Sequence, residues 1–322
     1  MLKRMTIKRI LISSTALVAL FLIYLIPSDN DYNLKDLKQK LEYVNTNVES
    51  AEIYLLGQNN LLTRTTVPVT EKVENTEKRA AEVLEFLKMN SKNESKIPSG
   101  FKAYLSEEAK INSIKFESGL LKVDVNEAFF DGKQEMEEKI VEGVVYTLTS
   151  IKGVEHVILY MNGTIVTKLP QTGTMLPATL DRSIGINKEY HISSYKDVNK
   201  VTVYYTTTFN EDVYYVPVTK YVNDSRDKIS IIIEELSGSS SASTNLMSYL
   251  NSKTRLMSYN EADDVLNLVF NSYIFDDADK QSILEEVIYT ISLSIADNYD
   301  VKEVAFMVDD KEIYKSVIKS IE

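Results

Sequence analysis

The sequence contains no cysteine, so disulfides, thiolate nucleophiles and zinc–thiolate sites are excluded. Histidine is almost as scarce, because only His156 and His191 occur. Their spacing supports neither a Ser-His-Asp triad nor a two-histidine metal site. Glycine-rich phosphate loops are missing as well, since neither GxGxxG nor GxxxxGK[ST] is found. We therefore predict no catalytic, metal-binding or cofactor-binding residue, and a protein that is not an enzyme.

Charge is distributed unevenly along the chain. The net charge is −11 over 322 residues, yet the first nine residues carry four basic side chains and no acid. The remainder is therefore strongly acidic and would repel nucleic acid and anionic lipid headgroups. We expect no nucleic-acid partner.

Residues 10–26 form an uncharged run of 17 residues, ILISSTALVALFLIYLI. As a helix this run spans about 25 Å, the lower limit for crossing a bilayer. The preceding basic residues favour a cytoplasmic N-terminus, with the rest of the chain outside the membrane. A cleaved signal peptide is the alternative, but the exit sequence YLIPS lacks the small residues of a cleavage site. We predict an uncleaved signal anchor in residues 1–31, which gives a single-pass protein of the cytoplasmic membrane.

Residues 32–50 place apolar side chains at alternating spacings of three and four, from Leu34 to Val48. A juxtamembrane helix or spacer is the simpler interpretation. Self-association along a short coiled-coil seam stays open.

An internal repeat dominates the remainder. Residues 120–131 (LLKVDVNEAFFD) and 265–276 (VLNLVFNSYIFD) align without a gap, and Asn126 and Asp131 are identical to Asn271 and Asp276. Four further blocks recur in the same order, which indicates a duplication. These blocks are 53–56 with 203–205, 67–70 with 216–219, 146–148 with 289–291, and 154–157 with 301–304.

Both copies follow one pattern of periodicity, and we predict an α+β fold. The order is two strands, then α-β-β-α-β, with the two helices on one face of a small sheet. We place the first domain at 51–170, a linker at 171–200 and the second domain at 201–322. In the first copy we expect strands at 52–56 and 65–70, a helix at 77–89, a hairpin at 109–116 and 120–126, a helix from Asp131 to about Thr149, and a strand at 154–161. In the second copy the later elements fall at 227–237, 255–260, 265–271, 279–296 and 301–308.

The residues shared by the copies have structural explanations. Asp131 and Asp276 fit helix N-caps, and Asn126 and Asn271 fit hydrogen-bonded turns at strand ends. The pairs at 276–277 and 309–310 lack the regular oxygen ligands and glycine of a calcium loop. Residues 169–173 (LPQTG) match a sortase signal but lie far from the C-terminus, so we interpret them as a linker turn. The abundant tyrosines fit strand packing, and binding of sugar rings by exposed tyrosines stays open.

The repeat resembles the GerMN domain, a module found in tandem in sporulation and germination proteins of Gram-positive bacteria. The resemblance covers about residues 51–316. It rests on a Tyr-containing opening strand and on residues 67–69 (VPV), 97–100 (IPSG), 119–129 (GLLKVDVNEAF), 144–148 (VVYTL), 154–157 (VEHV), Asn162-Gly163 and 180–187 (LDRSIGIN).

The resemblance implies a ring-building-motif fold and a non-catalytic assembly role. It also implies that residues 180–187 form the joint between two such domains. The expected partners are proteins of an envelope or sporulation complex, with self-association as a further expectation and peptidoglycan binding as an alternative. The domains would lie outside the cell, or in the intermembrane space of a forespore. A lipid-anchored member of the family differs from this chain, which has no cysteine; the anchor at residues 10–26 would replace the lipid.

Overall fold

The computed structural model describes residues 49–318, except residue 73 and residues 239–244. Residues 49–322 form one compact unit. The predicted signal anchor and the apolar seam of residues 34–48 lie outside the described residues. Among the residues described, no helix is long and apolar enough to span a membrane.

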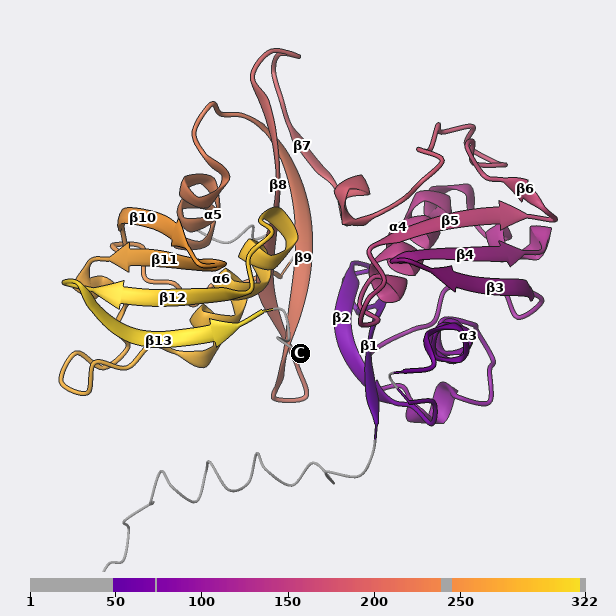
Figure 1. The fold of residues 1–322 in the computed structure, drawn as a ribbon, viewed down its shortest axis with the longest axis horizontal. Coiled ribbons are helices and arrows are strands. Elements are labelled where there is room, and N and C mark those ends of the chain that lie inside the picture. The colour runs from indigo at the N-terminus through magenta and orange to yellow at the C-terminus, as the bar shows by residue number, and fades with distance from the viewer. Residues whose placement is uncertain (1–48, 73, 239–244, 319–322) are drawn as a thin grey trace, which may run out of the picture. The chain divides into compact units, whose positions relative to one another are not determined.

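The first half follows the predicted order of elements (Figure 1). Its small sheet has the order β3-β4-β5-β6, and α4 connects the parallel neighbours β4 and β5. The elements are β1 (Ser50–Leu56), β2 (Leu62–Pro68), α3 (Thr76–Phe86), η1 (Glu94–Lys96), β3 (Ile111–Glu117), β4 (Leu120–Val125), η2 (Glu127–Phe130), η3 (Gln134–Met136), α4 (Glu137–Leu148), β5 (His156–Met161) and β6 (Thr164–Ile165).

The second half repeats this path, so the prediction of two tandem α+β copies is confirmed. Its small sheet has the order β10-β11-β12-β13, again with a parallel central pair. The edge strands β6 and β13 are additions that periodicity did not predict. The elements are β8 (Val198–Phe209), β9 (Asp212–Asn223), α5 (Lys228–Ser237), β10 (Leu256–Ala262), β11 (Val265–Phe270), η5 (Ser272–Ile274), α6 (Glu285–Asn298), β12 (Glu303–Val308) and β13 (Lys311–Val317).

Local sequence explains the hairpins. Ser118 and Gly119 both have positive φ, +48° and +81°, as a two-residue turn between β3 and β4 requires. Asn162 and Gly163 make the same kind of turn before β6. Alternate residues of β4 are fully buried and the others are partly exposed, which directs one face of the strand to the core.

The helices have neighbours on two sides. Besides facing the small sheets, α4 packs against β1 and α6 packs against β8; Figure 1 shows α6 between β8 and the sheet of β10–β13. Ten of the twelve residues of α4 are buried, as is typical of an enclosed helix. The prediction that the helices pack on one face of a small sheet is therefore incomplete. A second sheet, which contains β1 and β8, packs against the other side of α4 and α6.

This second sheet is shared by the two halves. It contains β1, β2, β9, β8 and β7 (Glu189–His191). The halves meet where Arg64 of β2 lies opposite Tyr215 of β9. Residues 171–200, predicted as a linker without clear periodicity, supply both β7 and the short helix η4 (Arg182–Ile184).

The predicted helix starts at Asp131 and at residues 276–279 are wrong. Asp131 follows η2 in extended backbone, and α4 begins only at Glu137. Asp276 pairs with Ser282 through its backbone N–H (2.9 Å), and α6 begins at Glu285. In both copies the chain first turns to bury apolar side chains over the strand ends, including Phe129 and Phe130 in the first.

The prediction for residues 227–237 is confirmed. Asp227 caps α5, and its side chain accepts a hydrogen bond from the Ser230 N–H at 2.8 Å.

Candidate functional site: the joint between the two halves

The repeated asparagines end their strands in the same way. The Asn126 side chain accepts a hydrogen bond from Lys110 N–H (2.8 Å) and donates one to the Glu108 carbonyl (3.0 Å). Asn271 does the same with Arg255 N–H (3.0 Å) and the Lys253 carbonyl (3.1 Å). The hydrogen-bonding role predicted for both residues is confirmed.

The other candidates from the sequence do not gather into one site. His156 Nδ1 lies 3.4 Å from Asp181 Oδ2, and His191 Nε2 lies 3.2 Å from Glu189 Oε2. Both histidines are exposed. The pair at 309–310 forms the turn between β12 and β13, with φ of +48° and +60°. In the described part of the chain, no three His, Cys, Asp or Glu residues are placed to hold a metal ion.

The LPQTG segment is anchored by a buried carboxylate. The backbone N–H groups of Gln171 and Thr172 each donate to Glu137 at 2.7 Å. Glu137 stands at the start of α4, so its negative charge also lies near the positive end of the helix dipole. This geometry fits the predicted turn and fixes it against the first half.

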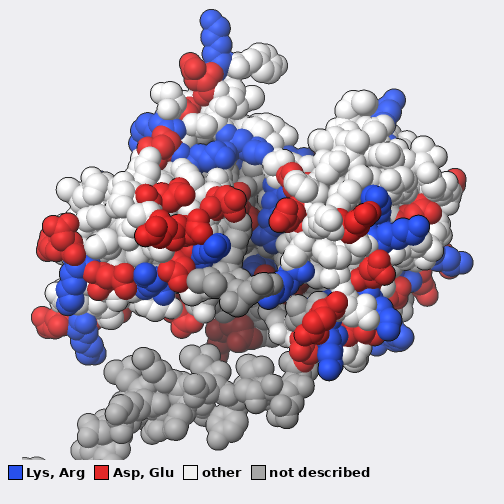
Figure 2. Space-filling view, viewed as in Figure 1, with Lys and Arg blue, Asp and Glu red and all other residues white. Residues whose placement is uncertain are grey.

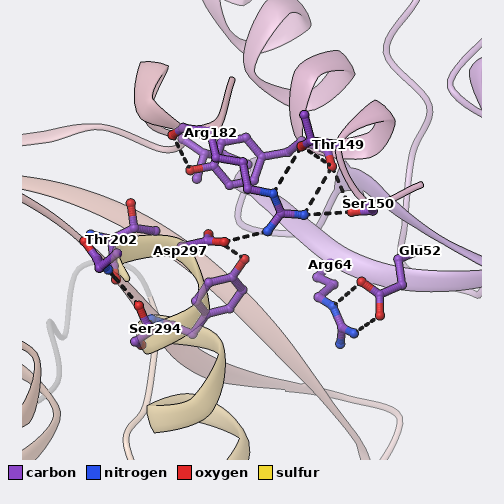
Figure 3. Close-up of polar contacts among 12 residues, drawn as sticks. Glu52, Arg64, Thr149, Ser150, Arg182, Thr202, Ser294 and Asp297 are labelled. Carbon is purple, nitrogen blue, oxygen red and sulfur yellow. Dashed lines mark hydrogen bonds and ion pairs between the residues drawn. The ribbon is translucent and has the colours of Figure 1, made fainter. Parts of the chain in front are cut away.

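Buried polar groups gather instead at the joint between the halves, around Arg182 of η4. Figure 3 shows its guanidinium between the end of α4 and Asp297 of α6. It donates to Thr149 Oγ1 (3.1 Å), Ser150 Oγ (2.8 Å) and Asp297 Oδ1 (2.6 Å). The Asp297 side chain is 2% exposed and the Arg182 side chain is 26% exposed, so this partly buried ion pair joins the first half, residues 171–200 and the second half.

Tyrosines enclose this ion pair. Tyr204 donates to Asp297 Oδ2 (2.9 Å), and its hydroxyl oxygen lies 3.0 Å from that of Tyr54. The guanidinium carbon also lies 5.0 Å from the centre of the Tyr146 ring, a cation–π distance. Burial alone would lower the pKa of Arg182, but Asp297 and the surrounding tyrosines raise that pKa well above its usual value. Arg182 is therefore a permanent cation and a structural group.

Tyr54 and Tyr204 occupy matching positions in the two copies. Tyr54 N–H donates to Thr147 Oγ1 (3.0 Å), and Tyr204 N–H donates to Ser294 Oγ (2.9 Å). The sequence repeat had matched Thr147 with Thr290, which lies one helical turn earlier than Ser294.

The first two strands of each half, β1–β2 and β8–β9, form the opening hairpins. Their register corrects the alignment of a second repeat block. Tyr54 lies opposite Arg64 and Tyr204 lies opposite Pro217. The alignment of 67–70 with 216–219, which matched Pro217 with Pro68, is therefore wrong in space. The duplication itself stands, because both copies follow the same chain path.

Asn187 forms a second link between the halves. Its side-chain amide donates to the carbonyls of Leu62 and Pro217, both at 2.8 Å, and its oxygen accepts from Leu62 N–H at 2.9 Å. Its own backbone N–H donates to Glu142 at 2.9 Å. Asn187 has φ of +47°, which asparagine tolerates better than most residues. One buried side chain therefore joins β2 to β9.

Backbone geometry explains a glycine in the same segment. Gly185 has φ of +79°, and a Cβ there would lie 3.0 Å from the Thr219 side chain. Thr219 Oγ1 in turn accepts from Ile186 N–H at 2.9 Å. Composition and periodicity gave no sign that residues 182–187 join the halves; only the family resemblance pointed to them.

The joint is held by the hydrogen bonds of Asn187 and by the ion pair between Arg182 and Asp297. These contacts favour a rigid connection between the two halves. Together with the path of each half, the joint defines a protein made of two copies of one α+β module connected by a buried polar segment.

Comparison with known proteins agrees with this class. The model of the family described as "Germane: Sporulation and spore germination" matches residues 52–167 and 202–314. The chain belongs to this family and is a tandem GerMN-domain protein.

One relative and a solved structure of its tandem domains support this assignment. The spore germination protein GerM of Bacillus subtilis (strain 168) is 32% identical over 265 residues, which cover 81% of this chain and 71% of that protein. The solved structure of the tandem GerMN domains of the sporulation protein GerM from Bacillus subtilis superposes with a TM-score of 0.74 at 29% identity. It covers 82% of this chain and 92% of that structure.

Proposed function

We propose that this chain is a non-enzymatic, membrane-anchored assembly protein. It would act outside the cytoplasmic membrane, or between the two membranes around a forespore, in a sporulation or cell-envelope complex. The domain packing would be of the ring-building type. Support comes from membership in a sporulation and germination family and from the uncharged run at residues 10–26.

One structural observation carries the assembly role: the second small sheet ends in two edge strands that expose apolar side chains. β10 and β13 are the edge strands of the second small sheet. Met257 on β10 is 66% exposed and Val317 on β13 is 59% exposed. Edge strands offer unpaired backbone groups to a neighbouring chain, and exposed apolar side chains add contact area.

Charge would limit which partner docks on this half. Figure 2 shows acidic side chains on the face that carries β10–β13. Exposed acids in the turns of this sheet include Asp263, Asp264, Asp309 and Asp310. A partner surface with basic residues opposite these turns would therefore be favoured.

Sedimentation of the fragment 49–322, which contains both hydrophobic cores, tests the proposal. We expect its mean mass to rise with concentration. Met257→Lys should weaken this rise because it places a desolvated charge in the contact. Lys315→Arg, which keeps the charge on β13, is the matched control. A monomer at every concentration, or turnover of a cell-wall substrate by the fragment, would contradict the proposed function.

A further inference from the structure

A groove of about 670 Å³ lies where the two copies meet, away from the Arg182 ion pair. Its walls are the turn after β1 and residues 100–101 from the first half, with the facing ends of β8 and β9 and residues 245–247 from the second. A volume of this size suits a small ligand or a short stretch of polymer.

The two walls are built from matching segments. In the first half Leu56 exchanges backbone hydrogen bonds with Lys102, at 3.1 and 2.9 Å. In the second half Thr206 exchanges backbone hydrogen bonds with Met247, both at 2.8 Å. Leu56 and Thr206 each stand two residues after the matched tyrosines, so the duplication forms the groove, and backbone pairing fixes it before any ligand arrives.

Aromatic rings of the groove are held in place by close packing. A Cβ on Gly100 would lie 2.6 Å from the Phe209 ring, and Gly100 has φ of +90°. The IPSG motif therefore ends in glycine because the backbone passes directly over this ring. Next to it, the rings of Phe101 and Tyr214 meet edge to face at 4.7 Å between centroids. All three rings are half-buried, which leaves part of each accessible.

The polar lining is uncharged. Although 26% of the chain is charged, the groove is lined by no Asp, Glu, Lys or Arg. Its polar lining includes instead Gln58, Thr207 and Thr208, whose side chains make no hydrogen bond within the described residues. Leu246 and Met247 add an apolar end.

This combination matches the surface of a neutral sugar. A pyranose ring offers C–H faces to aromatic rings and a rim of hydroxyls to amides and threonines. An acetamido group adds a methyl for the apolar end and an amide for Gln58. A phosphate or carboxylate would find no cation in the lining, and its desolvation would go uncompensated.

We propose that this groove binds an uncharged glycan segment of the N-acetylhexosamine class. Such a site would bring the assembly protein to cell-wall glycan and makes peptidoglycan a partner of the groove. It involves neither β10 nor β13, so loss of glycan binding and loss of assembly are separate results.

Calorimetric titration of the full chain tests the site. The probes are β-1,4-linked N-acetylglucosamine hexamer, cellohexaose, and an uncharged alanine-rich peptide. We expect the acetylated hexamer to bind at least roughly tenfold more tightly than cellohexaose, because one well-placed amide and methyl contribute about that factor. An absence of hexamer binding, equal binding of both glycans, or binding of the peptide alone would overturn the proposal.

Thr208→Arg locates the site. Thr208 lines the groove and is exposed, so an arginine there adds bulk and a positive charge at the groove without disturbing a core. Thr66→Arg, at an exposed position of β2 outside the groove, is the matched control. Hexamer affinity should fall by at least roughly tenfold in the first variant and stay unchanged in the second. Equal affinity in both would place the glycan elsewhere and overturn the assignment.

Discussion

Arg182 is a partly buried cation whose charge is balanced by the buried carboxylate of Asp297. Asp297 accepts from Arg182 and from Tyr204, so removal of its charge affects both neighbours. A buried ion pair adds little over an apolar replacement, but breaking it by neutralising one partner leaves an uncompensated charge.

We therefore expect Asp297→Asn to lower the free energy of unfolding by about 3–5 kcal/mol. Urea titration followed by circular dichroism measures the change. The matched control is Asp264→Asn, which breaks the exposed pair with Lys302 (2.8 Å) and should cost less than about 1 kcal/mol. Similar losses in both variants would show that burial does not set the value of the Arg182 pair.

At the scale of single elements, Asp227 and Asp131 differ in their role at a helix start. Asp227 caps a real helix start, whereas Asp131 stands in extended backbone before α4. Both are aspartates at the predicted start of a helix, and aspartate is a favoured N-cap residue. The difference arises because Asp131 directly follows η2, and η3 intervenes between Asp131 and α4.

This contrast predicts unequal effects of the same substitution. Asp227→Ala should lower the free energy of unfolding by about 0.5–2 kcal/mol, because it removes the acceptor of the Ser230 N–H. Asp131→Ala, at an exposed position, should stay within about 0.5 kcal/mol of the parent. Thermal and urea unfolding measure both variants, and a larger loss at Asp131 would contradict the observed helix starts.

At the scale of the whole molecule, each half has its own hydrophobic core. The joint connects these two cores. Asn187 is the side chain that connects β2 directly to β9, with three hydrogen bonds from its amide. Its removal leaves buried backbone groups on both strands without that partner, at about 1–3 kcal/mol for each unsatisfied group.

We expect Asn187→Gly to uncouple the halves while it keeps the positive φ accessible. In the parent, the free energy of opening measured by hydrogen exchange should be similar for the amides of β4 and β11. In the variant, this free energy should differ between the two strands. Asn210→Gly, at another positive-φ asparagine in the exposed turn of β8 and β9, is the matched control. Hydrogen-exchange mass spectrometry reads each strand, and continued joint exchange in Asn187→Gly would refute this role.

Much of each half was predictable because its signals are local. The alternation in β4 and β11, the turns at Ser118-Gly119 and Asn162-Gly163, and the cap at Asp227 depend on neighbours a few residues away. The tandem α+β organisation followed from these signals and from the repeated blocks.

The sequence by itself determined the duplication, most strands and the family to which the chain belongs. Only the tertiary structure decided where α4 and α6 begin, which residues of the two opening hairpins correspond, and which contacts residues 182–187 make at the joint that the family resemblance implied. The physical reason is distance along the chain: Tyr54 meets Tyr204 across 150 residues and Arg182 meets Asp297 across 115. Such contacts have no period or spacing in the sequence, and they form only when both halves have folded around them.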